Sequence, residues 1–293
     1  MPPYVSRTAL LRNHLVAATS VGRRYAHSAS RTLPIFSLEG KTCVVTGASQ
    51  GLGSQILAAF ALSGAKGAVV DLSQDSAEST VADLKKEVKE AGLQEPDIKA
   101  YECDTSSEEM VTKTWDEIVK HFKRVDVLVT NAGVAGGAAA EEYDFKDWQK
   151  ILDVNVNGTF LFARAAGKHM IEQKIPGSII MIGSMSGSIV NKPQKQSAYN
   201  ASKAAVNHMM RSFATEWGEH GIRVNALSPG YIQTAKTQGD EMEALSKQWV
   251  DMIPLHRIAK PDEFRGTVVW MASDASSYLT GTDIVVDGGY TAW

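Results

Sequence analysis

Seven short apolar segments alternate with longer helix-like segments along most of this 293-residue chain. The apolar segments have the length and composition of buried strands, and the runs between them carry apolar residues at helical spacing. Because parallel strands need crossover connections, the alternation predicts one α/β domain with a doubly wound parallel sheet and helices on both faces. The predicted strands are Cys43–Thr46, Ala68–Asp71, Ile98–Cys103, Val125–Thr130, Ser178–Ile182, Arg223–Ser228 and Asp283–Val286.

A glycine-rich turn joins the first predicted strand to the helical run Ile56–Leu62. Its sequence is Thr46-Gly-Ala-Ser-Gln-Gly-Leu-Gly53. Such a turn lets the backbone approach a pyrophosphate, which then lies at the helix N-terminus where N–H groups are free. The spacing differs from the commoner Gly-x-Gly-x-x-Gly pattern, and a glycine cluster alone could be a plain turn. In its strand–turn–helix context it predicts a dinucleotide site at Gly47, Ser49, Gln50, Gly51, Leu52 and Gly53.

The choice between NAD and NADP depends mainly on Asp71, which ends the second predicted strand. A carboxylate at this place accepts hydrogen bonds from a ribose 2′-hydroxyl and repels a 2′-phosphate. Leu72 and Ser73 add no positive charge, and Gln50 in the turn is neutral. We therefore expect NAD to be preferred, with NADP left open. The local alternative is that Asp71 caps the helix expected from Ser73 onward.

Tyr199 and Lys203 stand four residues apart in a segment with helical periodicity, so their side chains share one face. A free tyrosine has a pKa of about 10, and a nearby cation lowers that pKa. The phenol can then act as an acid or base on an alcohol or carbonyl oxygen. Ser184, upstream, can donate a hydrogen bond to the same oxygen. A Tyr-x-x-x-Lys pair also occurs by chance on helices, so its meaning depends on the glycine turn.

Taken in order, these motifs resemble the short-chain dehydrogenase/reductase family over roughly Leu38 to Trp293. The resemblance implies a Rossmann-like fold and an NAD(P)-dependent oxidoreductase that acts on CH–OH groups. It also implies a homo-oligomer, a tetramer or a dimer. The matching pieces are Thr46–Gly53, Asp71, Cys103-Asp104, Asn131-Ala-Gly133, Asn155, Ser184, Tyr199, Lys203, Ser228-Pro-Gly230 and Asp287-Gly-Gly289.

The family resemblance implies four catalytic residues. Ser184 would hold the substrate oxygen and Tyr199 would be the acid/base. Lys203 would bind the nicotinamide ribose and lower the pKa of the tyrosine. Asn155 would anchor a water in the proton relay, with Asn157 as a nearby competitor.

The resemblance also implies cofactor contacts beyond the glycine turn and Asp71. Asp104 would meet the adenine, and Asn131 would lie against the cofactor at a strand end. Gly230, Ile232 and Thr234 would contact the nicotinamide and a phosphate.

The stretch around the expected active site resembles, more narrowly, the fungal polyol dehydrogenases and ketose reductases. It reads Gly183-Ser-Met-Ser-Gly-Ser-Ile-Val-Asn191, followed by Pro193-Gln194 and Tyr199-Asn200. This implies hydride transfer between a polyol, or another secondary alcohol, and its ketose or ketone. Two alternatives stay open: a reductase of a larger carbonyl such as a ketoacyl thioester, and a non-catalytic dinucleotide-binding protein. A polar pocket favours the polyol and a wide apolar pocket favours the larger carbonyl.

Composition excludes several other classes of protein. A hydrophobic content of 44% in 293 residues is enough to bury one full core. The net charge of −3 argues against nucleic acid as the main partner, and no apolar run reaches membrane-spanning length. Cys43 and Cys103 are expected to be buried in reduced form, and the scattered histidines indicate no metal site.

The first 37 residues differ from the rest of the chain. They contain no acidic residue and carry five arginines, with frequent Ser, Thr and Ala. This composition resembles a mitochondrial transit peptide, and Arg23-Arg24-Tyr25-Ala26 resembles a matrix-protease cleavage site after Tyr25. We therefore expect a transit peptide at 1–37, an enzyme domain at 38–293 and a location in the mitochondrial matrix. The alternative is a basic tail on a cytoplasmic enzyme.

Overall fold

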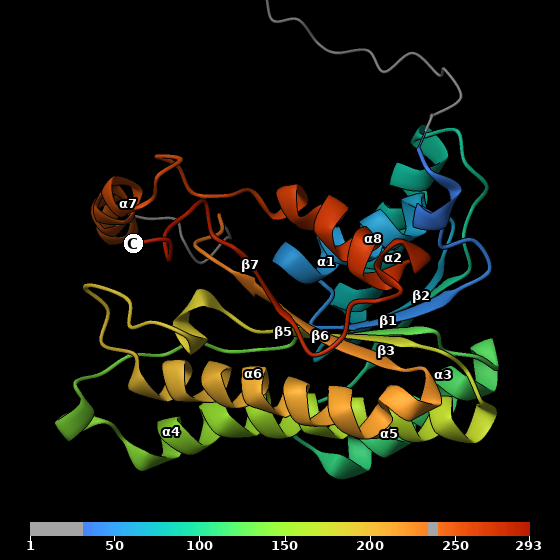
Figure 1. The fold of residues 1–293 in the computed structure, drawn as a ribbon, viewed down its shortest axis with the longest axis horizontal. Coiled ribbons are helices and arrows are strands. Elements are labelled where there is room, and N and C mark those ends of the chain that lie inside the picture. Colours follow the sequence, from blue (N-terminus) through green and yellow to red (C-terminus); the bar gives the residue numbers. More distant parts are fainter. Residues whose placement is uncertain (1–31, 234–239) are drawn as a thin grey trace, which may run out of the picture. The chain divides into compact units, whose positions relative to one another are not determined.

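Seven parallel strands form one sheet in the computed structural model, in the order β3-β2-β1-β4-β5-β6-β7 (Figure 1). The structure describes residues 32–233 and 240–293. All seven predicted strands are present and the predicted fold class is confirmed, with β2 beginning two residues earlier and β4 two residues later than expected. The strands are β1 (Thr42–Thr46), β2 (Lys66–Asp71), β3 (Ile98–Glu102), β4 (Val127–Thr130), β5 (Ser178–Ile182), β6 (Arg223–Pro229) and β7 (Asp283–Val286).

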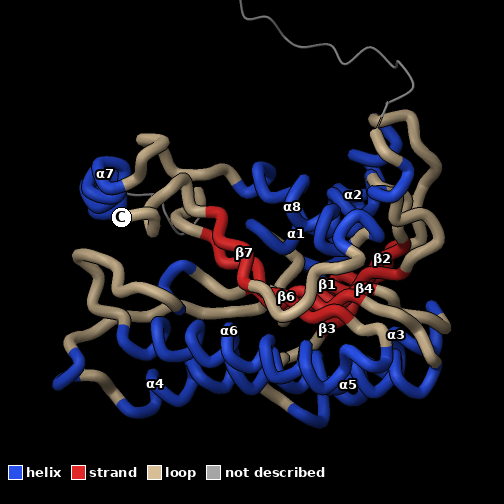
Figure 2. The backbone as a smooth tube through the Cα atoms, in the orientation of Figure 1, coloured by secondary structure: helices blue, strands red, loops and turns tan. Residues whose placement is uncertain are grey.

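Helices cover both faces of this sheet (Figures 1 and 2). One layer contains α1 (Gly51–Leu62), α2 (Gln74–Glu90) and α8 (Arg265–Ala272). The other contains α3 (Glu108–Phe122), α4 (Phe145–Leu152), α5 (Gly158–Gln173) and α6 (Ser197–Trp217). A further helix, α7 (Asp240–Met252), lies outside these two layers, near the C-terminal end (Figure 1).

The central strands are buried on both faces, which explains their continuous apolar runs. All five residues of β1 are buried. Successive side chains alternate between faces, so Val45 packs in the core beneath α1 while Val44 packs in the core beneath α3 and α5. Full burial of a valine contributes about 1.5–3 kcal/mol.

The strand order reverses between β1 and β4, which are neighbours in the sheet. In an open α/β sheet, ligands bind outside the carboxyl ends of the strands at this reversal. The glycine turn follows β1, Asn131 directly follows β4, and Ser184 lies two residues after the end of β5. The topology therefore brings these three motifs to the same edge of the sheet.

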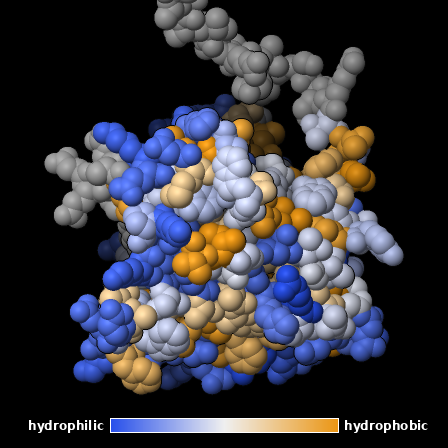
Figure 3. All heavy atoms as spheres, turned by 60° about the vertical axis from the view of Figure 1, so that its left-hand side comes forward, coloured by the Kyte–Doolittle hydropathy of each residue, from blue (hydrophilic) through white to orange (hydrophobic). Residues whose placement is uncertain are grey.

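Residues 34–293 form one compact unit. Residues 1–31 of the transit peptide predicted at 1–37, with its cleavage site, lie outside the described residues, and so does Thr234. The domain boundary at residue 38 stays a prediction. Within the described ranges, no helix is both long and apolar enough to cross a membrane, and no three His, Cys, Asp or Glu residues gather as metal ligands would. Figure 3 brings forward the side that carries α7, where apolar patches lie between hydrophilic residues.

Candidate active site

The glycine turn between β1 and α1 is shaped by glycines that no other residue could replace without strain. Gly47 and Gly51 have φ angles of 61° and 57°, in the left-handed region. A Cβ on Gly47 would lie 2.8 Å from the Cα of Ala132, and a Cβ on Gly53 would overlap the carbonyl oxygen of Gly47. The turn is therefore packed tightly against the end of β4.

Asn131 holds this turn from the neighbouring strand. Its Nδ2 donates to the carbonyl oxygens of Thr46 and Gly47, at 3.0 and 2.8 Å. Its backbone N–H donates to Thr46 Oγ1 at 3.0 Å. The sequence predicts Asn131 against the cofactor, and the structure shows what its side chain does at that place: it fixes the turn.

Asp71 lies beside the turn, at the end of β2. Its Oδ2 accepts from the Ser49 N–H at 2.9 Å, and its Oδ1 accepts from the Leu72 N–H at 2.8 Å. Helix α2 is capped instead by Ser73, whose Oγ accepts from Ser76 N–H. The alternative of a helix-capping Asp71 is therefore wrong.

The residues present fit a dinucleotide. Ser49 Oγ is buried in the turn without a hydrogen-bond partner among the described residues. Gln50, at the start of α1, makes no side-chain cap to the first turn of the helix, and that first turn contains no acid. Backbone N–H donors and a hydroxyl thus remain for a phosphate at a positive helix end, while Asp71 supplies the acceptor expected for a ribose.

The other predicted cofactor contacts lie along the same edge. Asp104 Oδ1 accepts from the N–H and hydroxyl of Ser106, which orders the loop before α3. A Cβ on Gly230 would lie 2.7 Å from the Cα of Asp287, so only glycine fits there. Ile232 pairs with Ala259 in an isolated bridge. Leu52 is half-buried and packs against the α1-side core.

Ser184, Tyr199 and Lys203 come together where the loop after β5 meets α6. The Lys203 ammonium is buried and donates to the carbonyl oxygen of Ile182 at 2.8 Å. The same ammonium lies 5.7 Å from the centre of the Tyr199 ring. Ser184 is buried, and its Oγ accepts from Ser186 N–H at 3.1 Å. A phenol, a hydroxyl and an ammonium thus occupy one site.

Burial dominates the protonation behaviour of this group. Burial raises the pKa of the Tyr199 phenol, and its hydrogen bond with Ser184 acts in the opposite direction. Burial also lowers the pKa of Lys203 to about 8. The pKa of Tyr199 was expected to be lowered by the lysine, but in the structure the net direction is upward, because the loss of hydration outweighs the hydrogen bond.

Asn155 lies beside this group in a π-helical turn, Asp153–Asn157, that joins α4 to α5. It is fully buried: Oδ1 accepts from Val134 N–H at 2.8 Å, and Nδ2 donates to Val134 O and Ser202 Oγ. A Cβ on Gly133 would meet Asn155 Oδ1 at 3.3 Å and Lys203 Nζ at 3.8 Å. The competing Asn157 instead donates to Asp153 Oδ1 at the surface. The structure therefore brings Asn155, and not Asn157, to the lysine.

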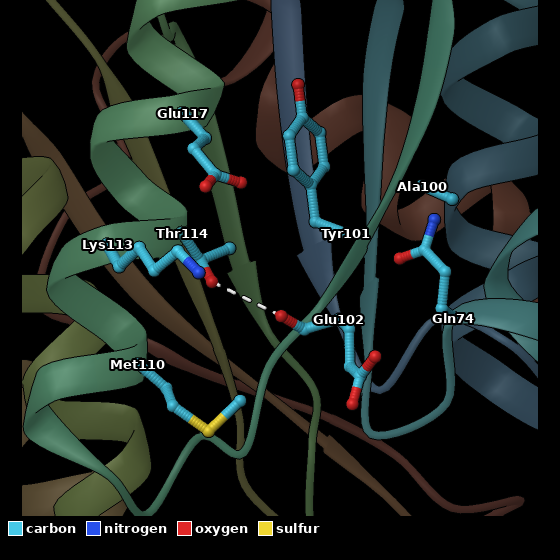
Figure 4. Close-up of a pocket in the computed structure, with 8 residues that line it drawn as sticks. All are labelled: Gln74, Ala100, Tyr101, Glu102, Met110, Lys113, Thr114 and Glu117. Atoms are coloured by element: carbon cyan, nitrogen blue, oxygen red, sulfur yellow. Dashed lines mark hydrogen bonds between the residues drawn. The ribbon is translucent and has the colours of Figure 1, made fainter.

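A polar pocket elsewhere contains none of the predicted site residues (Figure 4). It is lined by residues of β3 and α3 with Gln74 of α2, and Thr114 Oγ1 donates there to the Glu102 carbonyl oxygen. Because β2, β1 and β4 lie between β3 and β5, this pocket is separate from the Tyr199 group.

Comparisons with known proteins identify the family of the chain. The family described as "Enoyl-(Acyl carrier protein) reductase" matches residues 47–291. D-arabinitol 2-dehydrogenase (ribulose-forming) of Candida tropicalis is 41% identical, over 89% of this chain and 96% of that protein. NADH-dependent L-xylulose reductase of Ambrosiozyma monospora is 37% identical, over 89% and 98%. NADP-dependent mannitol dehydrogenase of Alternaria alternata is 38% identical, over 87% and 94%.

The structural comparison points the same way. A short-chain type dehydrogenase/reductase from Mycobacterium marinum matches with a TM-score of 0.83 and 38% identity, over 88% of this chain and 98% of that one. The chain belongs to the short-chain dehydrogenase/reductase family. The sequence-based assignment to this family is confirmed, and so is an oxidoreductase acting on CH–OH groups. The roles of the individual site residues stay predictions.

The sequence motifs did not predict that two aromatic residues lie near this short-chain dehydrogenase/reductase site. Tyr231 follows Gly230 at the end of β6, and Trp249 lies on α7. Their rings stack with centroids 4.1 Å apart and planes 7° apart. The position of Tyr231 directly after Ser228-Pro-Gly230 was a usable signal for its place. Nothing in the local sequence points to Trp249.

Proposed function

We propose that this protein is an NAD-dependent polyol dehydrogenase or ketose reductase in which Tyr199 is the acid/base. The observation that carries the proposal is the grouping of Ser184, Tyr199 and Lys203, with Asn155 beside the lysine. This group lies on the sheet edge that also carries the glycine turn. A non-catalytic dinucleotide-binding protein would not need this group.

A bound nicotinamide dinucleotide supplies the hydride donor or acceptor. The glycine turn would hold its phosphates, Asp71 its adenosine ribose and Lys203 its second ribose. Ser184 accepts from Ser186 N–H, and its hydroxyl forms a hydrogen bond with the Tyr199 phenol, so it lies where its proton could be redirected to a substrate oxygen at that phenol. Tyr199 then exchanges a proton with that oxygen.

The direction of the reaction sets what Tyr199 must do. Because burial raises the pKa of Tyr199, the phenol holds its proton at neutral pH and can give it to a ketose carbonyl oxygen. Polyol oxidation needs the phenol to release that proton first. The Lys203 ammonium and the Ser184 hydrogen bond favour this release.

Two observations support a polyhydroxylated substrate. The three relatives are named for arabinitol, xylulose and mannitol. The loop between β5 and α6 carries the carboxamides of Asn191, Gln194 and Gln196. Gln196 donates to Asn191, and both Asn191 and Gln194 form hydrogen bonds with the Tyr231 hydroxyl. Carboxamides suit hydroxyl-rich ligands, whereas an acyl chain calls for an apolar wall.

The preference for NAD rests on Asp71. Its carboxylate is held at the strand end by two backbone N–H groups. The names of the relatives include both an NADH-dependent and an NADP-dependent enzyme, so ancestry leaves the choice open.

The direct test is a panel of C5 and C6 polyols and ketoses, assayed by nicotinamide absorbance with both cofactors. We expect turnover of at least one polyol–ketose pair. Turnover of a ketoacyl thioester with no activity on any polyol or ketose would favour the larger-carbonyl alternative.

We also propose a homo-oligomer, a tetramer or dimer, that uses the outer face of α5 and α6. Val206 and Met210 on α6 face the core, so they do not contribute to that face. Phe160 on α5 is exposed, and Phe213 lies next to it, with ring centroids 6.3 Å apart. Light scattering at micromolar concentration tests this proposal, and a monomeric mass would contradict it.

We propose, from the basic segment at 1–37, that the protein is imported into the mitochondrial matrix. N-terminal sequencing of protein isolated from cells is the measurement. A start beyond the basic segment in a mitochondrial fraction is expected, and an intact Met1 or Pro2 in a cytosolic pool would contradict it.

A further inference from the structure

A single amide oxygen connects three segments around the candidate active site. Gln194, in the loop before α6, accepts at Oε1 from the Tyr231 hydroxyl at 3.1 Å. The same Oε1 accepts from Trp249 Nε1 at 3.2 Å. The partners are 37 and 55 residues away in sequence, one just after β6 and the other on α7. Gln194 therefore links the loop after β5 to both of them.

The two donors form a rigid aromatic pair. Tyr231 and Trp249 are stacked, and the Tyr290 ring meets Tyr231 edge-on at 5.5 Å. Trp249 is only 3% exposed. Such pairs are stabilised by about 0.5–1.5 kcal/mol beyond the apolar area that they bury, and a buried indole N–H needs an acceptor. Gln194 is the acceptor that meets this need.

Hydrogen bonds continue from this pair to the catalytic serine. Asn191 Nδ2 donates to the Tyr231 hydroxyl at 3.2 Å, and Asn191 Oδ1 accepts from Ser186 Oγ at 2.6 Å. Ser186 in turn donates its backbone N–H to Ser184 Oγ. Gln196 Nε2 braces the same loop by donating to Asn191 Oδ1 at 3.1 Å. A displacement of Tyr231 would thus change the position of Ser184 through these hydrogen bonds.

We propose that Gln194 is a positioning residue that holds α7 and Tyr231 against the loop carrying Ser184, and so sets the affinity for the polyol. The inference rests on the proposed function and deepens it. Gln194 acts through its two donors and not by contact with the reacting atoms. The dinucleotide turn lies at β1 and α1, and the described hydrogen bonds of this network do not reach it. Binding of the phosphates and the adenosine at that turn should therefore be independent of Gln194, whereas the nicotinamide end would meet Gly230 and Ile232, on either side of Tyr231.

The test compares two substitutions at this residue. Gln194→Leu removes the acceptor at similar volume and leaves a hydroxyl and an indole N–H without their partner. We expect the KM for the polyol to rise about tenfold, which corresponds to about 1.4 kcal/mol, while the KM for NAD rises less. Gln194→Glu keeps the acceptor and should restore the polyol KM to within about threefold. Gln149→Leu, at an exposed position on α4, is the matched control and should behave as wild type.

A second readout needs no substrate. The emission of Trp249, obtained as the difference between each protein and its Trp249→Phe counterpart, should change in Gln194→Leu and be preserved in Gln194→Glu. Unchanged polyol KM in Gln194→Leu, or equal impairment in Gln194→Glu, would overturn the proposal. If wild type turned over no polyol, the proposed function would fail, and the emission result would still show whether Gln194 positions α7.

Discussion

Exchange of the acid at the end of β2 should change the cofactor preference. The variant is Asp71→Ser combined with Leu72→Arg. The first substitution removes the carboxylate that two N–H groups hold in place. The second adds a cation at a side chain that is 67% exposed, so little packing is lost. An arginine can bind a 2′-phosphate through two parallel hydrogen bonds.

The expected magnitude follows from the charges. A 2′-phosphate carries nearly two negative charges and would lie close to the carboxylate. With an effective dielectric constant of about 40 and a separation of about 5 Å, each pair of unit charges repels by roughly 1.7 kcal/mol. Two charges give about 3 kcal/mol, or on the order of a hundredfold in favour of NAD. The variant should lose this preference and move toward NADP.

The assay is the ratio of kcat/KM for NAD and NADP in wild type and variant. Asp75→Asn is the matched control, because it removes an exposed carboxylate four residues along the chain, in the first turn of α2. That control should leave the ratio unchanged. A wild-type preference for NADP would refute the reasoning, since the fixed carboxylate would then not face the 2′-position.

Other substitutions test the site and the scaffold. Lys203→Met should lower kcat by about a hundredfold or more and raise the KM for NAD, and an unchanged KM would contradict the dual role of the ammonium. Burial lowers the pKa of His169, whose Nε2 accepts from Val125 N–H. As the pH falls, the unfolded chain therefore binds a proton at this histidine before the folded protein does. The free energy of unfolding should then fall below a pH of about 6.5, by up to about 1.4 kcal/mol per pH unit. His169→Gln should reduce that slope in urea titrations, and an identical slope would exclude the histidine. Gly47→Ala should cost about 1–3 kcal/mol of unfolding free energy, because φ is 61° and its Cβ would lie 2.8 Å from Ala132 Cα; a urea midpoint equal to wild type would contradict this.

The fold could be predicted because the strands are buried on both faces. Residues such as Val44 and Val45 need apolar partners on opposite sides, which gives β1 an unbroken apolar run. The start of β2 was missed because Lys66 and Gly67 have little strand preference of their own. They are in the strand because they pair with Thr42 and Cys43 of β1.

Only those parts of the site that are built from local sequence motifs could be predicted. The glycine turn and the Tyr199–Lys203 spacing are local and follow from backbone and helix geometry. The Gln194 network joins segments that are far apart in sequence, so no local pattern signals it. The net pKa direction of Tyr199 also depends on burial, which the sequence shows less directly than the nearby lysine.

The central claim is that the Tyr199 hydroxyl carries the proton. Tyr199→Phe removes this hydroxyl and keeps the ring beside Lys203. The decisive measurement is single-turnover polyol oxidation by Tyr199→Phe protein whose NAD affinity has been measured separately by titration. The account predicts wild-type NAD binding with turnover lowered by at least about a hundredfold. Near-normal turnover in that variant would contradict the assignment of Tyr199 as the acid/base.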